Sequence, residues 1–412
     1  MNAAADNLAI AAEPAPSRPR LTPEFRLACA CCLWPPSAER DQRVRAACEG
    51  VDWDAFLRVL DRQRVYGLAQ HALLTARAPM PAAIQRQLVA RAASVARVGA
   101  TLAAETARLH QRLSETAIPA LFFKGATLAQ LAYGSQALKH GRDIDFIVPP
   151  ACVETTWRLL EADGYQPLAG YRDLTPAQRQ TVLRLHKDLE LVCLDRRTRV
   201  ELHWRLADNR ALLAGLGADS PSQTVRLPHG EARTLADPQL FAYLCVHGAS
   251  HAWFRLKWLA DLNAWLSHKS DAEIEAFYAY AATQGVEACA GQALLLRQRL
   301  LGVSPPPALA RSLERSWAQR WMTAAALDAV AGGRGEVELA HRPFGPFRLL
   351  PSQFFRGRGL AFVFAQSGLL TESLDDTLRH PLPPALRFLY PLMRLPLWLL
   401  RLARRRRQRP AV

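Results

Sequence analysis

The spacing of hydrophobic residues changes twice along this 412-residue chain. From about residue 21 to 115, and again from about 235 to 330, apolar residues recur every three or four positions, which predicts helices packed on a core. Only between about 116 and 208 do short apolar runs, typical of strands, alternate with helical segments. The pattern predicts an α+β fold in which helical regions flank one small mixed unit.

Five parts are predicted along the chain: a disordered N-terminus (1–20), a helical N-terminal region (21–115), the mixed core (116–210), a helical domain (211–335), and a C-terminal extension with a basic tail (336–412). The first of these is rich in Ala and Pro, a composition that does not form a packed core. Within the mixed core, four segments are expected to be strands: 118–125, 143–149, 188–195 and 198–206.

The charge balance favours an anionic partner. Lys and Arg number 52 against 37 Asp and Glu, a net charge of +15, which suits a nucleotide, a nucleic acid or an acidic membrane surface. Six arginines fall within residues 401–409, whereas the whole chain has only five lysines, at 124, 139, 187, 257 and 269. Because arginine is the default cation here, a lysine inside a motif calls for a chemical explanation.

The cytoplasm is the expected compartment. The N-terminus lacks the basic leading region and long apolar segment of a secretory signal, and no apolar stretch reaches membrane-spanning length. Eight scattered cysteines suit free thiols in a reducing environment. The group "CACC" at 29–32 lacks a second Cys or His pair at zinc-binding spacing, so it does not predict a metal site.

Two carboxylates share one strand face in "HGRDIDFIV" (140–148). Asp143 and Asp145 are two residues apart at the start of an apolar run, so their side chains point the same way. Like charges so placed repel unless a cation neutralises them, and Mg²⁺ prefers oxygen ligands. Glu201 in "TRVELHWRL" would supply a third carboxylate from a neighbouring strand. The alternatives are a solvated aspartate pair and an exposed strand glutamate.

A strand passes through Lys124-Gly125 into a helix in "FFKGATLAQLAYG" (122–134). Free backbone N–H groups at a helix start, a glycine that allows close approach and a lysine charge together suit a phosphate. A glycine that simply makes a tight turn is the alternative.

In combination, these motifs resemble the nucleotidyltransferase 5 family, a bacterial group of uncharacterised nucleotidyltransferases within the DNA polymerase beta-like superfamily. The resemblance rests on three segments and extends from about residue 50 to 270: "IPALFFKGATLAQLAYGSQALKHGRDIDFIVP", "VELHWRL" and "LCVHGASHAWFRLKWLADL". It implies a polymerase-beta-like core that transfers a nucleoside monophosphate from a nucleoside triphosphate to an acceptor, with Mg²⁺, and releases pyrophosphate.

The resemblance also implies roles for individual residues. Asp143, Asp145 and Glu201 match the metal-binding carboxylates, which hold one or two Mg²⁺ ions. Lys124 and Gly125 stand where the superfamily binds the triphosphate, although its serine is replaced by Ala126 and then Thr127. The expected phosphate-binding residues are Lys124, Gly125, Thr127, Lys139 and Arg142, with Lys139 at a position where the family usually has Arg.

Several residues near these motifs have more than one interpretation. His247 and His251 are one helical turn apart, which fits a nucleotide or substrate contact, a structural pair or a metal site. Lys257 and Asp261 follow them, and the resemblance places this region over the active-site cleft. His203 shares a strand face with Glu201 and would orient it or contact the substrate.

The sequence leaves the acceptor open: a small molecule, a peptide or a protein. Nucleic acid is a less favoured partner, because no stacking motif interleaved with basic residues is present. The C-terminal segment "LPPALRFLYPLMRLPLWLLRLARRRRQR" could contact a membrane surface, but its prolines favour a docked segment with a solvated basic end. Alternative functions are a non-catalytic nucleotide-binding or interaction protein that keeps the fold, and a transferase acting on nucleic acid.

Overall fold

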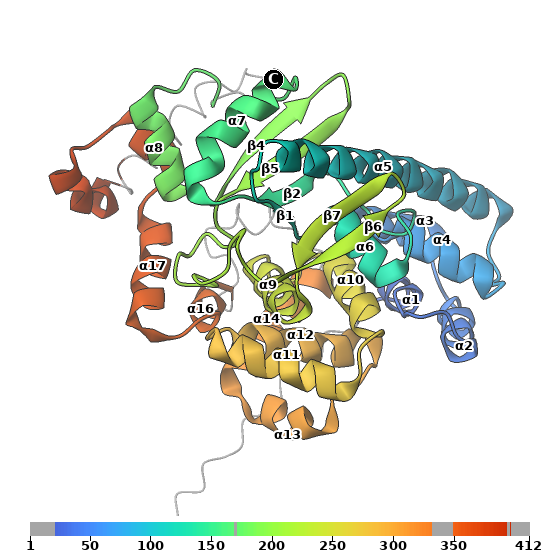
Figure 1. Cartoon of the computed structure of the whole chain (residues 1–412). Helices are drawn as coiled ribbons and strands as arrows, with labels where there is room; N and C mark the ends of the chain where they lie inside the picture. Colours follow the sequence, from blue (N-terminus) through green and yellow to red (C-terminus); the bar gives the residue numbers. More distant parts are fainter. Residues whose placement is uncertain (1–20, 169–170, 332–348, 394–395, 397–412) are drawn as a thin grey trace, which may run out of the picture.

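The computed structural model describes residues 21–168, 171–331, 349–393 and 396 (Figure 1). The N-terminal stretch predicted to be disordered (1–20) and the basic tail (401–409) lie outside the described residues.

Five helices form the N-terminal region: α1 (Pro23–Cys31), α2 (Ala38–Ala47), α3 (Trp53–Gln63), α4 (Tyr66–Thr75) and α5 (Ala82–Glu115). The first three begin at Thr22, Ser37 and Asp52, whose side chains accept hydrogen bonds from free backbone N–H groups of the first turn. At 34 residues, α5 is about 50 Å long. It reaches past the bundle and crosses the mixed unit (Figure 1).

A five-stranded sheet forms the mixed unit, in the spatial order β1-β2-β5-β4-β3. Its strands are β1 (Leu121–Phe122), β2 (Ile144–Ile147), β3 (Gln166–Pro167), β4 (Asp188–Cys193) and β5 (Thr198–His203). β2 and β5 are parallel, and the other neighbours are antiparallel. Helix α6 (Gly125–Tyr133) connects β1 to β2, while α7 (Val153–Ala162) and α8 (Pro176–Leu185) lie between β2 and β4. The α+β class and the four expected strands are confirmed; β3 was not predicted.

Residues 211–335 are not wholly helical, contrary to the prediction for this part of the chain. A two-stranded hairpin, β6 (Ser222–Leu227) and β7 (Gly230–Leu235), precedes the helices. Val225, Leu227 and Ala232 are buried in the core under α5. The approach is close, because a Cβ built at Gly230 would lie 3.2 Å from the Ala107 Cβ. The short spacing of these buried residues around a tight turn indicates a hairpin rather than a helix.

The remaining helices form the lower half of the molecule in Figure 1: α9 (Asp237–Ser250), α10 (Leu256–Leu266), α11 (Asp271–Thr283), α12 (Glu287–Leu296), α13 (Pro307–Arg315) and α14 (Trp317–Ala331). A π-helical segment, Arg297–Leu301, follows α12. The C-terminal extension contributes α16 (Leu349–Ser352), α17 (Gly359–Thr371) and α18 (Leu374–Arg379). Short 3₁₀ turns occur at Pro150–Cys152, Gln353–Phe355 and Pro384–Leu389.

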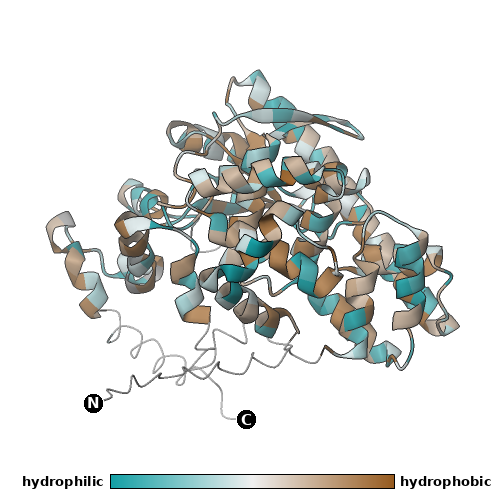
Figure 2. Cartoon of the chain, turned by 90° about the horizontal axis from the view of Figure 1, so that it is seen from below, coloured by the Kyte–Doolittle hydropathy of each residue, from teal (hydrophilic) through white to brown (hydrophobic). Residues whose placement is uncertain are grey.

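Among the described helices, none combines the length and apolar character that crossing a membrane requires. Figure 2 shows polar and apolar residues mixed along the outer helices.

The sheet separates two hydrophobic cores, and this arrangement positions the site. Phe122 and Phe146 stack on one face, inside the core shared with α5 and α7. Leu121 and Ile147 alternate to the other face, inside the core of the helical regions. Asp145 lies two residues before Ile147, so its side chain points toward the helical side.

Candidate active site

The strand register gathers acidic residues on this helical face. Asp145 on β2 is directly opposite Glu201 on the parallel strand β5. On the other side of β5, His203 is opposite Asp188 on β4. Residues opposite each other in a sheet share a face, so four ionisable side chains come together.

His203 lies at the centre of the cluster. Its Nε2 atom is 3.3 Å from Glu201 Oε2, 3.5 Å from Asp145 Oδ1 and 3.7 Å from Asp188 Oδ2. Asp145, Glu201 and His203 each offer a ligand atom, and these atoms all lie within 4.8 Å of one another. Within the described ranges, this is the one group of three or more such residues close enough to share a metal ion.

Lys124 neutralises the most buried carboxylate of the cluster. Its Nζ atom is 2.6 Å from Asp145 Oδ1, and the Asp145 side chain is only 2% exposed. Burial disfavours the charge of Asp145, but Lys124 and the hydrogen-bonding His203 hold the pKa of its carboxyl well below the usual range. Burial and the charge of Asp145 raise the pKa of Glu201 to about 7.

The other members of the cluster respond to the same charges. Burial disfavours the imidazolium of His203, but Asp188, with Asp145 and Glu201, raises its pKa. Lys187 forms an ion pair with Asp188 at the edge of the cluster. Burial opposes the charge of Asp188, and His203 and Lys187 lower its pKa. A single cation added to this cluster would therefore shift the pKa values of all four side chains.

The cluster lies in a cavity of about 240 Å³ between the sheet and the helices α9 and α10. Lys124 and Gly125 line it from the start of α6, and Lys139 to Asp143 from the loop before β2, with the exception of Arg142. Four of the five lysines of the chain line this cavity: Lys124, Lys139, Lys187 and Lys257.

Asp143 is in the cavity but not in the three-residue cluster. It is half-buried and immediately precedes β2. The three carboxylates predicted to bind metal, those of Asp143, Asp145 and Glu201, therefore line the same cavity. The third residue close enough to share an ion with Asp145 and Glu201 is His203, not Asp143.

The predicted phosphate-binding residues do not all line the same space. Gly125 has a φ of +58°, a conformation that favours glycine, and together with Lys124 it brings the start of α6 to the cavity. Thr127 is fully buried, and its hydroxyl oxygen lies 2.8 Å from the Phe122 carbonyl and 2.9 Å from that of Lys124, so it holds the turn and does not line the cavity. Arg142 is exposed and lies in a neighbouring groove.

Lys139 and Lys257 differ in their partners. Lys139 Nζ is 3.1 Å from Asp261 Oδ2, and the Tyr133 hydroxyl donates a 2.9 Å hydrogen bond to Asp261 Oδ1. Lys257 donates a long hydrogen bond of 3.4 Å to the His140 carbonyl oxygen. Burial and the charge of Lys139 lower the pKa of Lys257 to about 7.

His247 and His251 belong to an aromatic cluster. Their rings are 4.9 Å apart, and His251 stacks on Trp258 with ring centroids 5.0 Å apart. Burial and Lys124 lower the pKa of His247 well below its usual range, which favours the neutral imidazole. All three side chains line the cavity. In the part of the chain that the structure describes, no third metal-binding side chain lies close enough to His247 and His251 to share an ion with them.

Sequence reasoning missed several residues of the cavity. Arg64 comes from the end of α3, far away in sequence, and its pKa is lowered to about 10 by burial and by Arg255 and Arg142. Tyr243 lies on α9, within an otherwise apolar run. Asp188 had a usable signal in the sequence, because it begins the predicted strand 188–195, which directly precedes that of Glu201, and Lys187 is the residue before it.

Paired carboxylates on neighbouring strands, beside a strand–glycine–helix turn, are an arrangement that can hold a divalent cation next to a phosphate within an α+β fold. The chain belongs to the family described as uncharacterised nucleotidyltransferase, whose model matches residues 49–302. The protein therefore has the general activity of a nucleotidyltransferase, and a nucleoside triphosphate is the substrate that this implies. A search of the curated proteins found no match to this sequence.

Proposed function

We propose that the protein transfers a nucleoside monophosphate from a nucleoside triphosphate to an acceptor and releases pyrophosphate, with Mg²⁺ bound at the acidic cluster. The observation that carries this proposal is the Asp145–Glu201–His203 cluster, enclosed in one cavity with the Lys124-Gly125 turn.

The residues present fit a divalent cation. Asp145 and Glu201 offer carboxylate oxygens, the donors that Mg²⁺ prefers, and together with His203 their ligand atoms lie within 4.8 Å of one another. The Lys124 ammonium, 2.6 Å from Asp145 Oδ1, supplies positive charge at the place where a bound cation would share it. Asp145 and Glu201 would hold the ion, and His203 would orient the Glu201 carboxylate through their 3.3 Å contact. When bound, Mg²⁺ supplies positive charge to the phosphates and lowers the pKa of an attacking hydroxyl.

The protein's own groups would bind the triphosphate. Gly125 at the start of α6 lines the cavity, so the free backbone N–H groups of the first turn would bind phosphate oxygens, and Lys124 and Lys257 add positive charge. The stacked pair His251–Trp258 offers a ring surface on which a base can lie.

An acceptor oxygen would then attack the α-phosphorus. The bond from this phosphorus to the bridging oxygen breaks, and pyrophosphate leaves with the electron pair. Asp143 lines the cavity outside the three-residue cluster, and its carboxylate would take the proton of an acceptor hydroxyl.

The test incubates purified protein with α-labelled triphosphates, Mg²⁺ and cell extract. We expect wild type to transfer label and Asp145→Asn to lose transfer by at least a hundredfold. Asp195→Asn is the matched control, because Asp195 is an exposed carboxylate in the turn between β4 and β5. Tight nucleotide binding without any transfer by wild type would contradict the proposal and favour a non-catalytic binding protein.

A transferase acting on nucleic acid gives a different result in the same assay. Label would then appear on RNA or DNA, and binding would weaken steeply with salt.

A further inference from the structure

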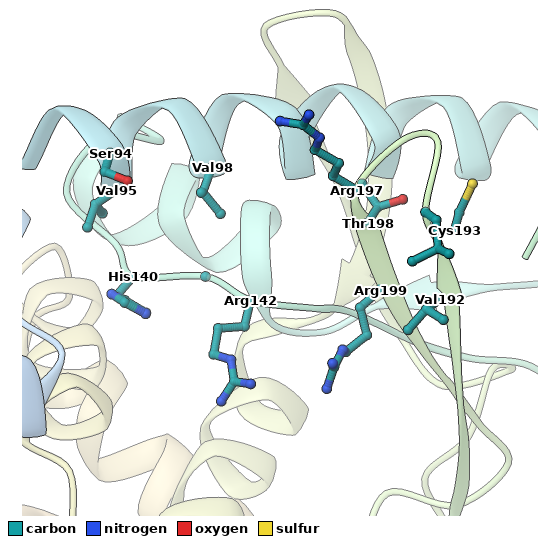
Figure 3. A pocket seen from close by; sticks show the side chains of 12 residues that line it. Ser94, Val95, Val98, His140, Arg142, Val192, Cys193, Arg197, Thr198 and Arg199 are labelled. Carbon is teal, nitrogen blue, oxygen red and sulfur yellow. The ribbon is translucent and has the colours of Figure 1, made fainter. Parts of the chain in front are cut away.

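A second space, a groove of about 550 Å³, lies directly beside the cavity. It runs between α5, the loop at 140–142 and the β4–β5 hairpin, as Figure 3 shows. His140 and Gly141 line both the groove and the cavity, so the two spaces adjoin at this loop. Gly141 packs closely against α5, because a Cβ there would lie 2.8 Å from Leu102 Cδ1.

Three arginines give the groove its charge: Arg142, Arg197 and Arg199. Arg199 forms an ion pair with Glu190. Arg142 and Arg197 are exposed, and neither has an acidic partner within the described ranges of the chain. In Figure 3, the Arg142 and Arg199 side chains extend away from α5, whereas the Arg197 side chain extends in the opposite direction, toward α5. Guanidinium groups without an acidic partner on both sides of the groove make it positively charged, which favours an anionic molecule.

The wall of the groove is apolar. Val98 on α5 is 43% exposed, and Leu194 at the end of the hairpin is 81% exposed. Val95 and Val192 also line the groove. Exposed apolar side chains next to arginines suit a molecule that has both an apolar part and an anionic group.

We propose that this groove binds the acceptor, and that the acceptor is a small molecule with a phosphate or carboxylate group attached to an apolar part. The inference rests on the proposed function. Arg197 binds the anionic group, Val98 and Leu194 contact the apolar part, and the attacking oxygen enters the cavity past His140 and Gly141.

The location of Asp143 supports this direction of entry. Asp143 lines the cavity and follows Arg142, which lines the groove. The residue proposed to accept the proton therefore lies next to the point where the two spaces meet.

The experiment separates the acceptor from the triphosphate. Cell extract is divided by size and by anion exchange, and each fraction is offered to the protein with labelled triphosphate and Mg²⁺. Binding of a fluorescent, non-hydrolysable triphosphate is measured in parallel. We expect label in a low-mass fraction that the anion-exchange resin retains. Phosphatase treatment of that fraction abolishes labelling if the anion is a phosphate, and leaves it if the anion is a carboxylate.

Two pairs of variants test the groove. Arg197→Gln is expected to raise the KM for the active fraction at least tenfold without changing triphosphate binding, because one charge-assisted contact is lost. Arg226→Gln is the control, since Arg226 is an exposed arginine on β6 outside the groove. Val98→Glu should impair transfer more than Val98→Lys, because both fill the groove but only the former repels an anion.

Four results would overturn the inference: label on a neutral acceptor, label on RNA or DNA, an unchanged KM for Arg197→Gln, or equal effects of the two Val98 variants. In each of these, wild type still transfers label, so the proposed function stands. Triphosphate binding without transfer to any fraction overturns both.

Discussion

Removing Lys124 should destabilise the metal-free protein more than removing its partner Asp145. The Asp145 side chain is 2% exposed and that of Lys124 is 18% exposed, with 2.6 Å between the charged atoms. In Lys124→Met, a fully buried carboxylate loses its counter-charge, which costs about 3–5 kcal/mol. In Asp145→Asn, Lys124 keeps some access to water and to Glu201, so the loss is smaller.

A divalent cation should narrow the difference in stability between the two variants. Mg²⁺ at a hundred times its dissociation constant stabilises a binding protein by about 2.7 kcal/mol. In Lys124→Met no ammonium competes for Asp145, so Mg²⁺ should stabilise this variant more than wild type. Asp145→Asn should gain least.

Urea unfolding followed by circular dichroism, with EDTA or with Mg²⁺, measures both effects. Lys269→Met is a matched control, because Lys269 pairs with Asp237 outside the cavity. Equal losses in the two variants with EDTA would refute the account of the pair. Equal stabilisation of Lys124→Met and Asp145→Asn by Mg²⁺ would refute cation binding at Asp145.

Three further outcomes are expected. The affinity for Mn²⁺, measured by electron paramagnetic resonance, should rise up to about tenfold per pH unit until pH 7. Below pH 7 the raised pKa of Glu201 keeps its carboxyl protonated, and a protonated carboxyl does not bind the ion. Glu201→Gln should make the affinity less dependent on pH. Gly125→Ala should cost about 1–2 kcal/mol of stability and weaken triphosphate binding, because its φ of +58° disfavours a side chain; an unchanged melting temperature would contradict this. Tyr133→Phe should cost about 1.5–3 kcal/mol by removing the hydrogen bond to Asp261, and a double-mutant cycle with Lys139→Met should show coupling between the two sites.

The strands around Asp145 and Glu201 were predictable because short apolar runs and turn residues mark them locally. Their pairing was also predicted, since β2 and β5 were expected to be neighbours. The contribution of Arg64 could not be foreseen, because helix packing alone brings the end of α3 to the cavity. Thr127 was assigned to phosphate from its position after Gly125, but its hydroxyl instead satisfies backbone carbonyls, a choice that depends on the local turn.

The hairpin of β6 and β7 shows a different limit. Its outward positions carry Arg226, Glu231 and Arg233, so only a few apolar residues mark the strands. A hairpin that packs on a neighbouring helix needs few apolar residues of its own. The alternation of apolar and polar residues that would predict its two strands is therefore hard to recognise in the sequence.

The concentration of lysines in the cavity makes this site chemically addressable. Amine-directed reagents usually modify many surface positions, but here four of the five lysine side chains line one cavity and the fifth pairs with Asp237. Burial and the charge of Lys139 lower the pKa of Lys257 to about 7, so near neutral pH a much larger fraction of its amine is uncharged and nucleophilic than in a lysine of ordinary pKa. A triphosphate that carries an aldehyde would therefore form its adduct preferentially inside the cavity, and the modified lysine, located by mass spectrometry, would report where the nucleotide lies.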